Sequence, residues 1–283
     1  MTTRFAPSPT GRLHLGHAYA ALVAHELARR HGGRFLLRFE DIDHTRVRPE
    51  HYEAIEEDLH WLGLQWDAPP MRQSGRREAY HQSRDRLAAL DLLYPCFCTR
   101  REIREEIARM SHAPHGPEGP LYPGTCRGLS PDERQRRLDA NQPHCWRLDA
   151  NAAREQTGPL TFHDLRAGTI PVDPGLLGDV VLARRDIATS YHLAVVVDDA
   201  AQEITDVTRG EDLLPSTHVH RLLQALLDLP EPRYLHHLLV TDAQGRRLAT
   251  RDKARTLATL RGAGWSPADI RAHLPALQSA DPA

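Results

Sequence analysis

Two histidines, His14 and His17, lie three residues apart at the start of a helical pattern. Side chains with this spacing emerge on one side of a helix, beside the unpaired backbone N–H groups and the positive end of the helix dipole. A helix start of this kind can hold phosphate. Gly16 has no Cβ and lets a ring or a phosphate approach the backbone. Two surface histidines are the alternative, but Pro7 and Pro9 favour a binding site because they impose a defined turn just before it.

Carboxylates follow the next strand pattern. Residues 2–6 and 34–39 are predicted strands on either side of a helix over residues 17–31, so the three form a β-α-β unit. In such a unit ligands bind at the carboxyl ends of the strands, where Ser8 and Glu40 would both lie. A carboxylate at that edge suits an ammonium group. A solvated loop paired with nearby arginines is the alternative.

Three cysteines, Cys96, Cys98 and Cys126, have the side chains that a metal site needs. Two thiols separated by one residue can grip a tetrahedral ion from a tight turn, and zinc accepts thiolates together with a nitrogen or oxygen donor. Three cysteines leave one ligand unassigned, and buried thiols without metal are an equally good interpretation of the spacing. Cys145 stands apart, beside Trp146, and is expected in the core.

The composition limits the class of protein. The 283 residues are 40% apolar and 26% charged, enough for a sizeable core in one large or two medium domains. We find no export-signal pattern and no apolar run of membrane-spanning length, so we expect a cytoplasmic protein without disulfides. The formal net charge is −2, so a nucleic acid would have to bind to a local basic face.

The first of these patterns resembles a known family. Residues 7–11 together with residues 14–17 resemble the first signature of class I aminoacyl-tRNA synthetases, and the form of residues 4–11 is that of the glutamyl branch. With gaps, the resemblance runs from Arg4 to about Arg255, and the short chain is similar in length to the tRNA-modifying paralogues of that branch. The resemblance implies an α/β fold: a Rossmann-like class I catalytic domain with a zinc-bearing α+β insertion and no anticodon-binding domain.

The same resemblance implies a division of the chain into domains. Residues 1–93 and 187–245 would form the nucleotide-binding catalytic domain, which is split in the sequence. Residues 94–186 would form the zinc-bearing insertion, which holds the acceptor end of the tRNA in similar proteins. Residues 246–283 would carry the loop of the second class I signature and a short helical tail.

The resemblance also assigns residues to the two small substrates. Glutamate would contact Arg4, Phe5, Ala6, Pro7, Ser8, Glu40, Tyr191 and Arg209. ATP would contact His14, Gly16, His17 and Thr250, and the catalytic residues would be His14, His17, Arg251 and Lys253. A dicarboxylate needs fixed cations; Arg209 offers the bidentate fork that suits one carboxylate, and Arg4 would supply a second cation. Without the resemblance, Tyr191 would be interpreted as a strand aromatic and Arg209 as a surface charge.

The second signature is where the sequence departs from the family. Relatives typically carry a lysine at the position of Thr250, and that lysine is expected to meet the ATP phosphates. A threonine supplies only one neutral hydroxyl. We therefore expect the long side chains of Arg251 and Lys253 to provide the missing charge.

For the metal, the resemblance supplies the fourth ligand. The family's insertion has a Cys-x-Cys and Tyr-x-x-x-Cys set, which corresponds here to Cys96, Cys98, Tyr122 and Cys126. His112 and His115 are nearby alternatives. We expect one structural zinc ion (Zn²⁺) per chain, together with Mg²⁺ bound to ATP.

The implied reaction is ATP-dependent activation of L-glutamate to glutamyl adenylate, followed by transfer of the glutamyl group to queuosine at the wobble position of tRNA(Asp). The amino acid carboxylate would attack the α-phosphorus in line, without a protein nucleophile. The alternatives are a conventional or fragmentary glutamyl-tRNA synthetase and a non-catalytic RNA-binding adaptor that has lost the ATP chemistry. The expected partners are glutamate, ATP and the queuosine-containing tRNA, with no membrane, and we expect a monomer.

Further elements follow from periodicity. A mostly apolar run predicts a buried parallel strand over residues 190–199. Additional strands are predicted over residues 205–212 and 234–240. Helices are predicted over residues 49–62, 78–93, 130–140 and 216–227, and a short capped helix within residues 265–277.

Overall fold

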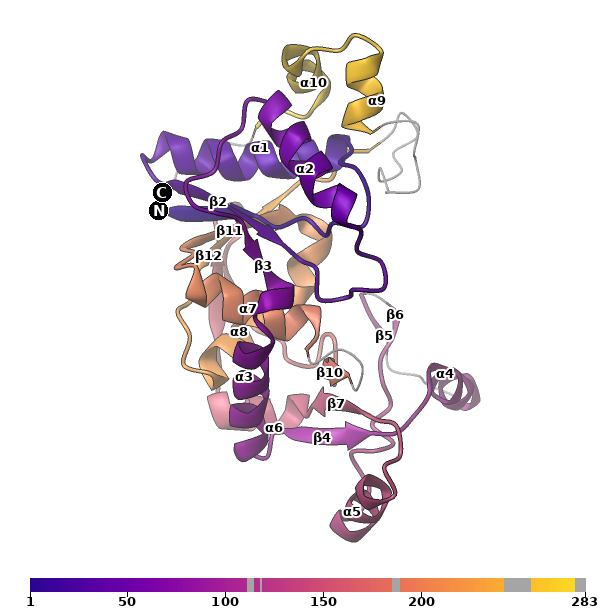
Figure 1. The fold of residues 1–283 in the computed structure, drawn as a ribbon. Helices are drawn as coiled ribbons and strands as arrows, with labels where there is room; N and C mark the ends of the chain where they lie inside the picture. Colours follow the sequence, from indigo (N-terminus) through magenta and orange to yellow (C-terminus); the bar gives the residue numbers. More distant parts are fainter. Residues whose placement is uncertain (111–114, 118, 185–188, 242–255, 278–283) are drawn as a thin grey trace.

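The computed structural model describes residues 1–110, 115–117, 119–184, 189–241 and 256–277. The chain begins with the predicted β-α-β unit. Strands β1 (Thr2–Phe5) and β2 (Arg34–Phe39) are parallel, and helix α1 (Leu15–Arg30) connects them. A short third strand, β3 (Met71–Arg72), pairs with the end of β2. The carboxyl ends of β1 and β2 therefore lie at one edge of the sheet (Figure 1).

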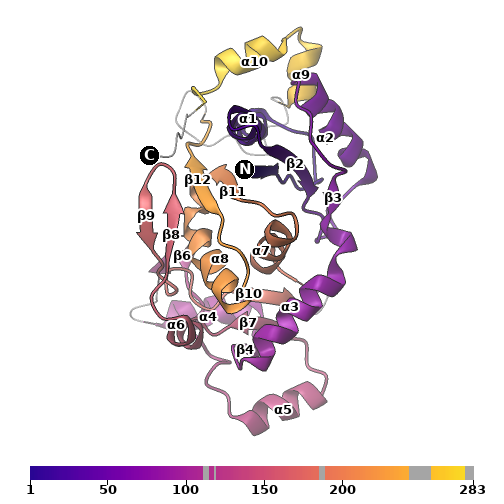
Figure 2. The same cartoon turned by 90° about the vertical axis from the view of Figure 1, so that its left-hand side faces the viewer.

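The layer of strands continues on the other side of β1. The backbone N–H of Thr205 donates to the carbonyl oxygen of Thr2 over 3.0 Å, which places the following strand beside β1. Neighbouring strands are parallel up to β8, and the last strand is its antiparallel hairpin partner. Figure 2 shows these strands in one layer. In order, they are β11 (Asp206–Gly210), β12 (Arg233–His237), β8 (Thr161–Asp164) and β9 (Gly168–Pro171).

Helices cover both faces of this layer. α1 packs on β1, β2 and β11, with α2 on the same side, whereas α7 and α8 lie on the opposite side (Figure 2). Each side has its own apolar core: Tyr19, Leu22 and Phe35 belong to the first, and Leu193 and Leu223 to the second. Burial of these side chains stabilises the layered arrangement. The helices are α2 (Pro49–Trp61), α3 (Arg77–Ala89), α7 (Tyr191–Ala201), α8 (Leu214–Leu226), α9 (Leu257–Gly262) and α10 (Pro267–His273), with 3₁₀ turns at Gln73–Gly75 and Glu211–Leu213.

A three-stranded antiparallel sheet lies in the lower part of Figure 1, away from α1. Its central strand pairs with both others, and Cys96 lies opposite Cys145 in the register. β8 pairs with β12 through Asp164 and Tyr234, so the segment between β4 and α7 also contributes to the four-stranded sheet of β11, β12, β8 and β9. The elements are β4 (Leu93–Cys96), β7 (Cys145–Leu148) and β10 (Val181–Arg184), helices α4 (Arg100–Arg109), α5 (Pro131–Asp139) and α6 (Ala150–Thr157), and the short pair β5 (His115–Gly116) and β6 (Gly119–Pro120).

The strand predicted over residues 190–199 is wrong, because this run forms helix α7. Residues 193–199 are all buried, since α7 packs between α3 and α8. A helix that is buried all round shows no hydrophobic periodicity. A short apolar run of this kind therefore cannot be distinguished from a buried strand by its pattern alone.

Most other predicted elements are confirmed, with shifts at their ends. The helix predicted over residues 78–93 stops at Ala89, because the chain turns and enters β4 at Leu93. Ser130 and Ser266 cap α5 and α10 with their side chains, as Ser-Pro starts predict. Helices α4, α6 and α9 were not predicted. No helix in the described residues is both long enough and apolar enough to cross a membrane.

Candidate active site

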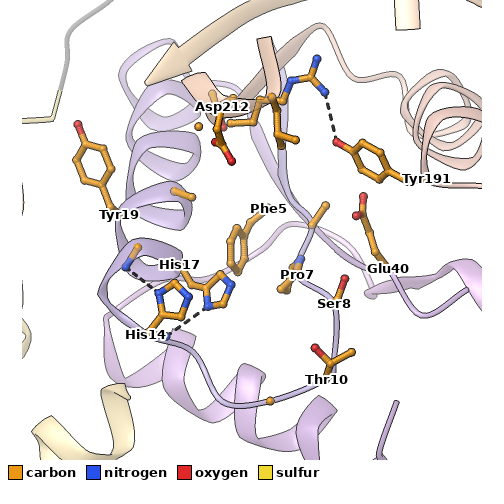
Figure 3. Close-up of a pocket in the computed structure, with 18 of the residues that line it drawn as sticks. Phe5, Pro7, Ser8, Thr10, His14, His17, Tyr19, Glu40, Tyr191 and Asp212 are labelled. Atoms are coloured by element: carbon orange, nitrogen blue, oxygen red, sulfur yellow. Dashed lines mark hydrogen bonds between the residues drawn. The ribbon is translucent and has the colours of Figure 1, made fainter. Parts of the chain in front are cut away.

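A cavity of about 730 Å³ opens at the carboxyl ends of β1, β2 and β11. Its volume is within the usual range of small-molecule sites. Figure 3 shows side chains from α1, from the loop after β1 and from α7 around this space. All eleven described residues that the sequence assigned to glutamate or ATP line it: Arg4, Phe5, Ala6, Pro7, Ser8, His14, Gly16, His17, Glu40, Tyr191 and Arg209.

The two histidines of the first signature cap the start of α1. Nδ1 of His14 accepts the backbone N–H of Gly16 over 3.1 Å, and Nδ1 of His17 accepts the backbone N–H of His14 over 3.3 Å. The two rings stack with their centroids 3.8 Å apart (Figure 3). Because Nδ1 is an acceptor in both rings, each neutral imidazole carries its proton on Nε2 and can donate it to an anion. A side chain at Gly16 would press on the His14 ring, since a Cβ there would lie 3.0 Å from Cε1.

Arg4, at the base of the cavity, is not a free cation. Its Nε and Nη2 donate to the two carboxylate oxygens of Asp199 over 2.9 and 3.3 Å, and its Nη1 donates to the carbonyl oxygen of Thr208. Arg38 shares the same carboxylate, with Nη1 2.6 Å from Oδ1 of Asp199. Although burial alone would raise the pKa of Asp199, Arg4 and Arg38 lower it below its ordinary value. Arg4 therefore lines the cavity as expected, but most of its charge is balanced within the protein.

Glu40 follows directly after β2 and faces the same space as Tyr191 (Figure 3). Its Oε1 lies 3.4 Å from Nη2 of Arg38. Burial raises the pKa of Glu40, and the charges of Arg38 and Arg4 oppose that rise only in part. A ligand ammonium beside this carboxylate would stabilise its charged form. The geometry thus suits the amino group of an amino acid.

Arg209, near the end of β11, has a different environment from Arg4. Among the described residues its guanidinium forms hydrogen bonds to neutral groups and no salt bridge to a carboxylate. Its Nη1 lies 3.4 Å from the hydroxyl oxygen of Tyr191. Burial raises the pKa of Tyr191, with Arg209 acting in the opposite direction, so the phenol stays protonated. A buried cation without a carboxylate partner is suited to bind one from a ligand.

Some lining residues were not predicted from the sequence. Tyr19 and Asp212 are labelled in Figure 3, and His237 at the end of β12 packs edge-on against Tyr19. Nε2 of His237 is buried and has no hydrogen-bond partner among the described residues. Tyr19 lies three positions after Gly16, and residues at this spacing share one side of a helix, so its place near the site could have been predicted from the helical pattern. Nothing in the sequence alone signals His237.

The predicted second-signature residues Thr250, Arg251 and Lys253 lie outside the described residues. The described residues on either side of that segment are at the site. Val240 lines the cavity, and Thr256 pairs with His14 in an isolated antiparallel bridge.

A second cluster with metal-binding chemistry lies near β4. The thiols of Cys96, Cys98 and Cys126 lie within 4.8 Å of one another. The hydroxyl oxygen of Tyr122 is 3.3 Å from the sulfur of Cys96 and 3.6 Å from that of Cys98. Zn–S bonds of about 2.3 Å in a tetrahedron place sulfurs about 3.8 Å apart, so this donor set fits zinc.

The thiols of the cluster differ in acidity. Hydrogen bonds from Cys126 and Cys145 lower the pKa of Cys96, and the thiolate is the form that binds metal. The hydrogen bond to Cys96, followed by burial, raises the pKa of Cys126, so Cys96 is the first of these two thiols to lose its proton. Cys145, expected simply in the core, is half-buried and packs beside this cluster. His112 lies outside the described residues, so the structure does not test it as an alternative ligand.

Comparisons with known proteins identify the family of the chain. A family model for the catalytic domain of class I tRNA synthetases (E and Q) matches residues 1–275. The chain belongs to this family. It is 50% identical over 277 residues to a glutamyl-Q tRNA(Asp) synthetase of Rhodobacter capsulatus, covering 96% of this chain and 98% of that protein. It is 40% identical over 280 residues to glutamate–tRNA ligase 2 of Alkalilimnicola ehrlichii, covering 96% of this chain but 57% of that protein.

A solved structure gives the same result for the fold. The crystal structure of the glutamate-tRNA synthetase of Elizabethkingia anophelis matches with a TM-score of 0.75 at 32% identity. The match covers 89% of this chain and 53% of that one, so the chain spans about half the length of this solved relative. The predicted α/β catalytic fold of a class I synthetase is confirmed.

Proposed function

We propose that this protein activates L-glutamate with ATP to glutamyl adenylate and transfers the glutamyl group to a tRNA. The observation that carries the proposal is the pairing, in one cavity, of a buried arginine whose described contacts include no carboxylate and a carboxylate that shares its arginine partner with Asp199. Arg209 fits the side-chain carboxylate of glutamate, and Glu40 fits its ammonium group. The first family signature and the names of the relatives support the same reaction.

The residues of the cavity then have distinct roles. The start of α1, with Nε2–H of His14 and His17, would receive the phosphates of ATP. The α-carboxylate of glutamate would attack the α-phosphorus in line and expel pyrophosphate. The protein contributes position and charge neutralisation, without a covalent intermediate on a side chain. Mg²⁺ would enter with ATP and neutralise further phosphate charge.

We further propose queuosine at the wobble position of tRNA(Asp) as the acceptor. A relative named glutamyl-Q tRNA(Asp) synthetase matches this chain over nearly its whole length, which supports this acceptor over that of a conventional glutamyl-tRNA synthetase.

We also propose the division into domains that the sequence predicts. A split catalytic domain comprises residues 1–93 and 187–245, an acceptor-binding insertion comprises residues 94–186, and residues 246–283 form the second-signature segment and tail. Because ATP and tRNA are cytosolic, we propose that the protein acts in the cytoplasm.

The deciding experiment is to incubate the protein with ATP, radiolabelled glutamate and either queuosine-containing or unmodified tRNA(Asp), and then to locate the label. We expect label only on the queuosine-containing tRNA, on the anticodon side. Label on the 3′ end of either tRNA would support a conventional synthetase. RNA binding without any adenylate formation would support the adaptor and contradict the proposal.

The first prediction concerns the second signature, residues 245–253, which lies outside the described part of the chain. Replacing Arg251 and Lys253 together by alanine should lower glutamate-dependent pyrophosphate exchange by about a hundredfold or more, the usual scale for losing charge stabilisation of a transition state. Thr250→Lys should raise the rate or leave it unchanged, because it restores a cation. An unaltered rate in the double variant would show that this segment does not serve ATP.

The second prediction concerns zinc. We propose one structural zinc ion bound by Cys96, Cys98, Tyr122 and Cys126. Cys126→Ser should lose the metal in elemental analysis, and Cys145→Ser, at the neighbouring thiol outside the set, should keep it. Loss of zinc should impair transfer to tRNA more than adenylate formation, because the cluster lies outside the cavity. Full retention of zinc in Cys126→Ser would contradict the site.

A further inference from the structure

The back of Arg209 is held by a chain of buried neutral groups. Nη1 of Arg209 lies 3.0 Å from Nδ1 of His220, and Nε lies 3.3 Å from Nε2 of His236. Nη2 donates to the hydroxyl oxygen of Thr217 over 2.5 Å. These bonds use three of the five N–H donors of a guanidinium. Two donors are left for the Tyr191 hydroxyl and for a ligand in the cavity.

The guanidinium fixes the tautomer of His220. Arginine has donors and no acceptor, so Nδ1 of His220 must offer its lone pair. The proton of the neutral ring is then on Nε2, which lies 3.2 Å from Nδ1 of His192. Burial, and after it the charge of Arg209, lowers the pKa of His220 well below its ordinary value. The ring is therefore neutral at physiological pH, as the contact with Arg209 requires.

His236 is oriented from the other side by Asp164. Nδ1 of His236 lies 2.7 Å from Oδ2 of Asp164, which also accepts the backbone N–H of His236. Burial acts against ionisation of Asp164, but the hydrogen bonds from the His236 ring and from three backbone N–H groups lower its pKa to about 2. Asp164 is thus a carboxylate acceptor, and His236 carries its proton on Nδ1. Its Nε2 lone pair is left for Arg209 and Thr217.

We propose that His220 and His236 are positioning residues that hold Arg209 through ring-nitrogen lone pairs, so that its orientation is fixed while its charge is kept for the side-chain carboxylate of the amino acid substrate. This inference rests on the proposed function. The comparison with Arg4 gives the physical reason: Asp199 fixes Arg4 equally well but balances its charge at the same time. A neutral histidine acceptor fixes the orientation of the guanidinium without balancing its charge. Asp164 contacts the ring of His236 on the side opposite Arg209, and the hydrogen bonds of Arg209 among the described residues do not include this carboxylate.

The test measures the Michaelis constants of glutamate-dependent pyrophosphate exchange. His220→Leu should raise the KM for glutamate by about tenfold or more, because the misplaced guanidinium binds the carboxylate less well. The KM for ATP should change by less than about twofold. His220→Asn should restore most of the affinity for glutamate, because its amide oxygen lies near the position of Nδ1. His220→Gln, whose amide reaches toward the position of Nε2, should not.

His218→Leu is the matched control. His218 is buried on the same helix, and its Nδ1 accepts the backbone N–H of Asp173 over 2.9 Å, away from Arg209. The His218→Leu variant should have a lower unfolding temperature than the parent but the same KM for glutamate. An equal rise in both leucine variants would mean that His220 is merely structural and would overturn the inference. If His220→Leu does not fold, the comparison of His220→Asn with His220→Gln decides in the same way.

His236→Gln and His236→Leu form a second pair. The amide of Gln can present an oxygen near the position of Nε2, so we expect His236→Gln to keep a lower KM for glutamate than His236→Leu. Equal values would overturn the role of this ring. If the parent protein exchanges pyrophosphate and His220→Leu has the same KM for glutamate as the parent, only this inference is refuted. No exchange in the parent would refute the proposed function and this inference with it.

Discussion

Arg209→Ala is expected to lower glutamate-dependent pyrophosphate exchange by about a hundredfold or more, which corresponds to about 2.7 kcal/mol of transition-state stabilisation. Arg209 is the buried cavity arginine whose described contacts include no carboxylate. Without it, the side-chain carboxylate of glutamate would enter a buried site unpaired, a loss of about 2–5 kcal/mol. The preference for glutamate over glutamine should disappear as well, because that preference requires a cation opposite the carboxylate.

Arg209→Lys separates charge from geometry. Lysine keeps a cation but loses the planar fork, so we expect activity between those of the parent and of Arg209→Ala. Arg221→Ala is the control: Arg221 lies on α8, pairs with Glu231 over 2.9 Å and does not line the cavity. The Arg221→Ala variant should exchange pyrophosphate at the rate of the parent and keep its preference for glutamate over glutamine. Exchange that responds equally to glutamine in the parent protein would contradict the assignment of Arg209.

The sequence predicted the lining of the cavity better than the elements that carry it. The motif residues of the first signature and Glu40 lie directly after β1 and β2, and parallel strands bring their carboxyl ends to one edge. Local sequence and the family resemblance therefore placed them together. Tyr191 was correctly expected at the site, although the strand predicted there is a helix. A fully buried helix and a buried strand give the same apolar pattern, and only packing against α3 and α8 decides between them.

The partners of the site residues could not be predicted in the same way. Arg4 and Asp199 are 195 positions apart in the chain, and nothing in either neighbourhood indicates that they meet. His220 lies on a helix whose pattern predicted only a buried apolar face. Such contacts depend on how the elements pack in three dimensions. The charge state of Arg4 and that of Arg209 therefore became distinguishable only in the structure.

Asp199→Asn is expected to destabilise the fold strongly. Its carboxylate is the shared partner of Arg4 and Arg38, with side chains 5% and 0% exposed. The amide would leave two buried guanidinium groups with Glu40 as their remaining counter-charge in this cluster. Breaking a buried ion pair by removing one partner costs about 3–5 kcal/mol. Chemical denaturation should therefore show a loss of this size in the free energy of unfolding.

Glu57→Gln is the control for this prediction. Glu57 pairs with Arg261 over 2.9 Å, but its side chain is 56% exposed, so its removal should cost less than about 1 kcal/mol. Similar losses in the two variants would contradict the role of burial.

The loss in Asp199→Asn should also depend on pH. The folded protein has a lowered pKa at Asp199, although burial opposes this, because Arg4 and Arg38 stabilise the carboxylate. The stabilisation is then complete above the unfolded pKa of about 3.9 and is lost as the pH falls through the lower folded pKa. The difference in unfolding free energy between parent and variant should therefore be largest near neutral pH and should shrink below about pH 4. A difference that widens as the pH falls would mean that Asp199 is protonated in the folded protein, and that Arg4 is not balanced by it.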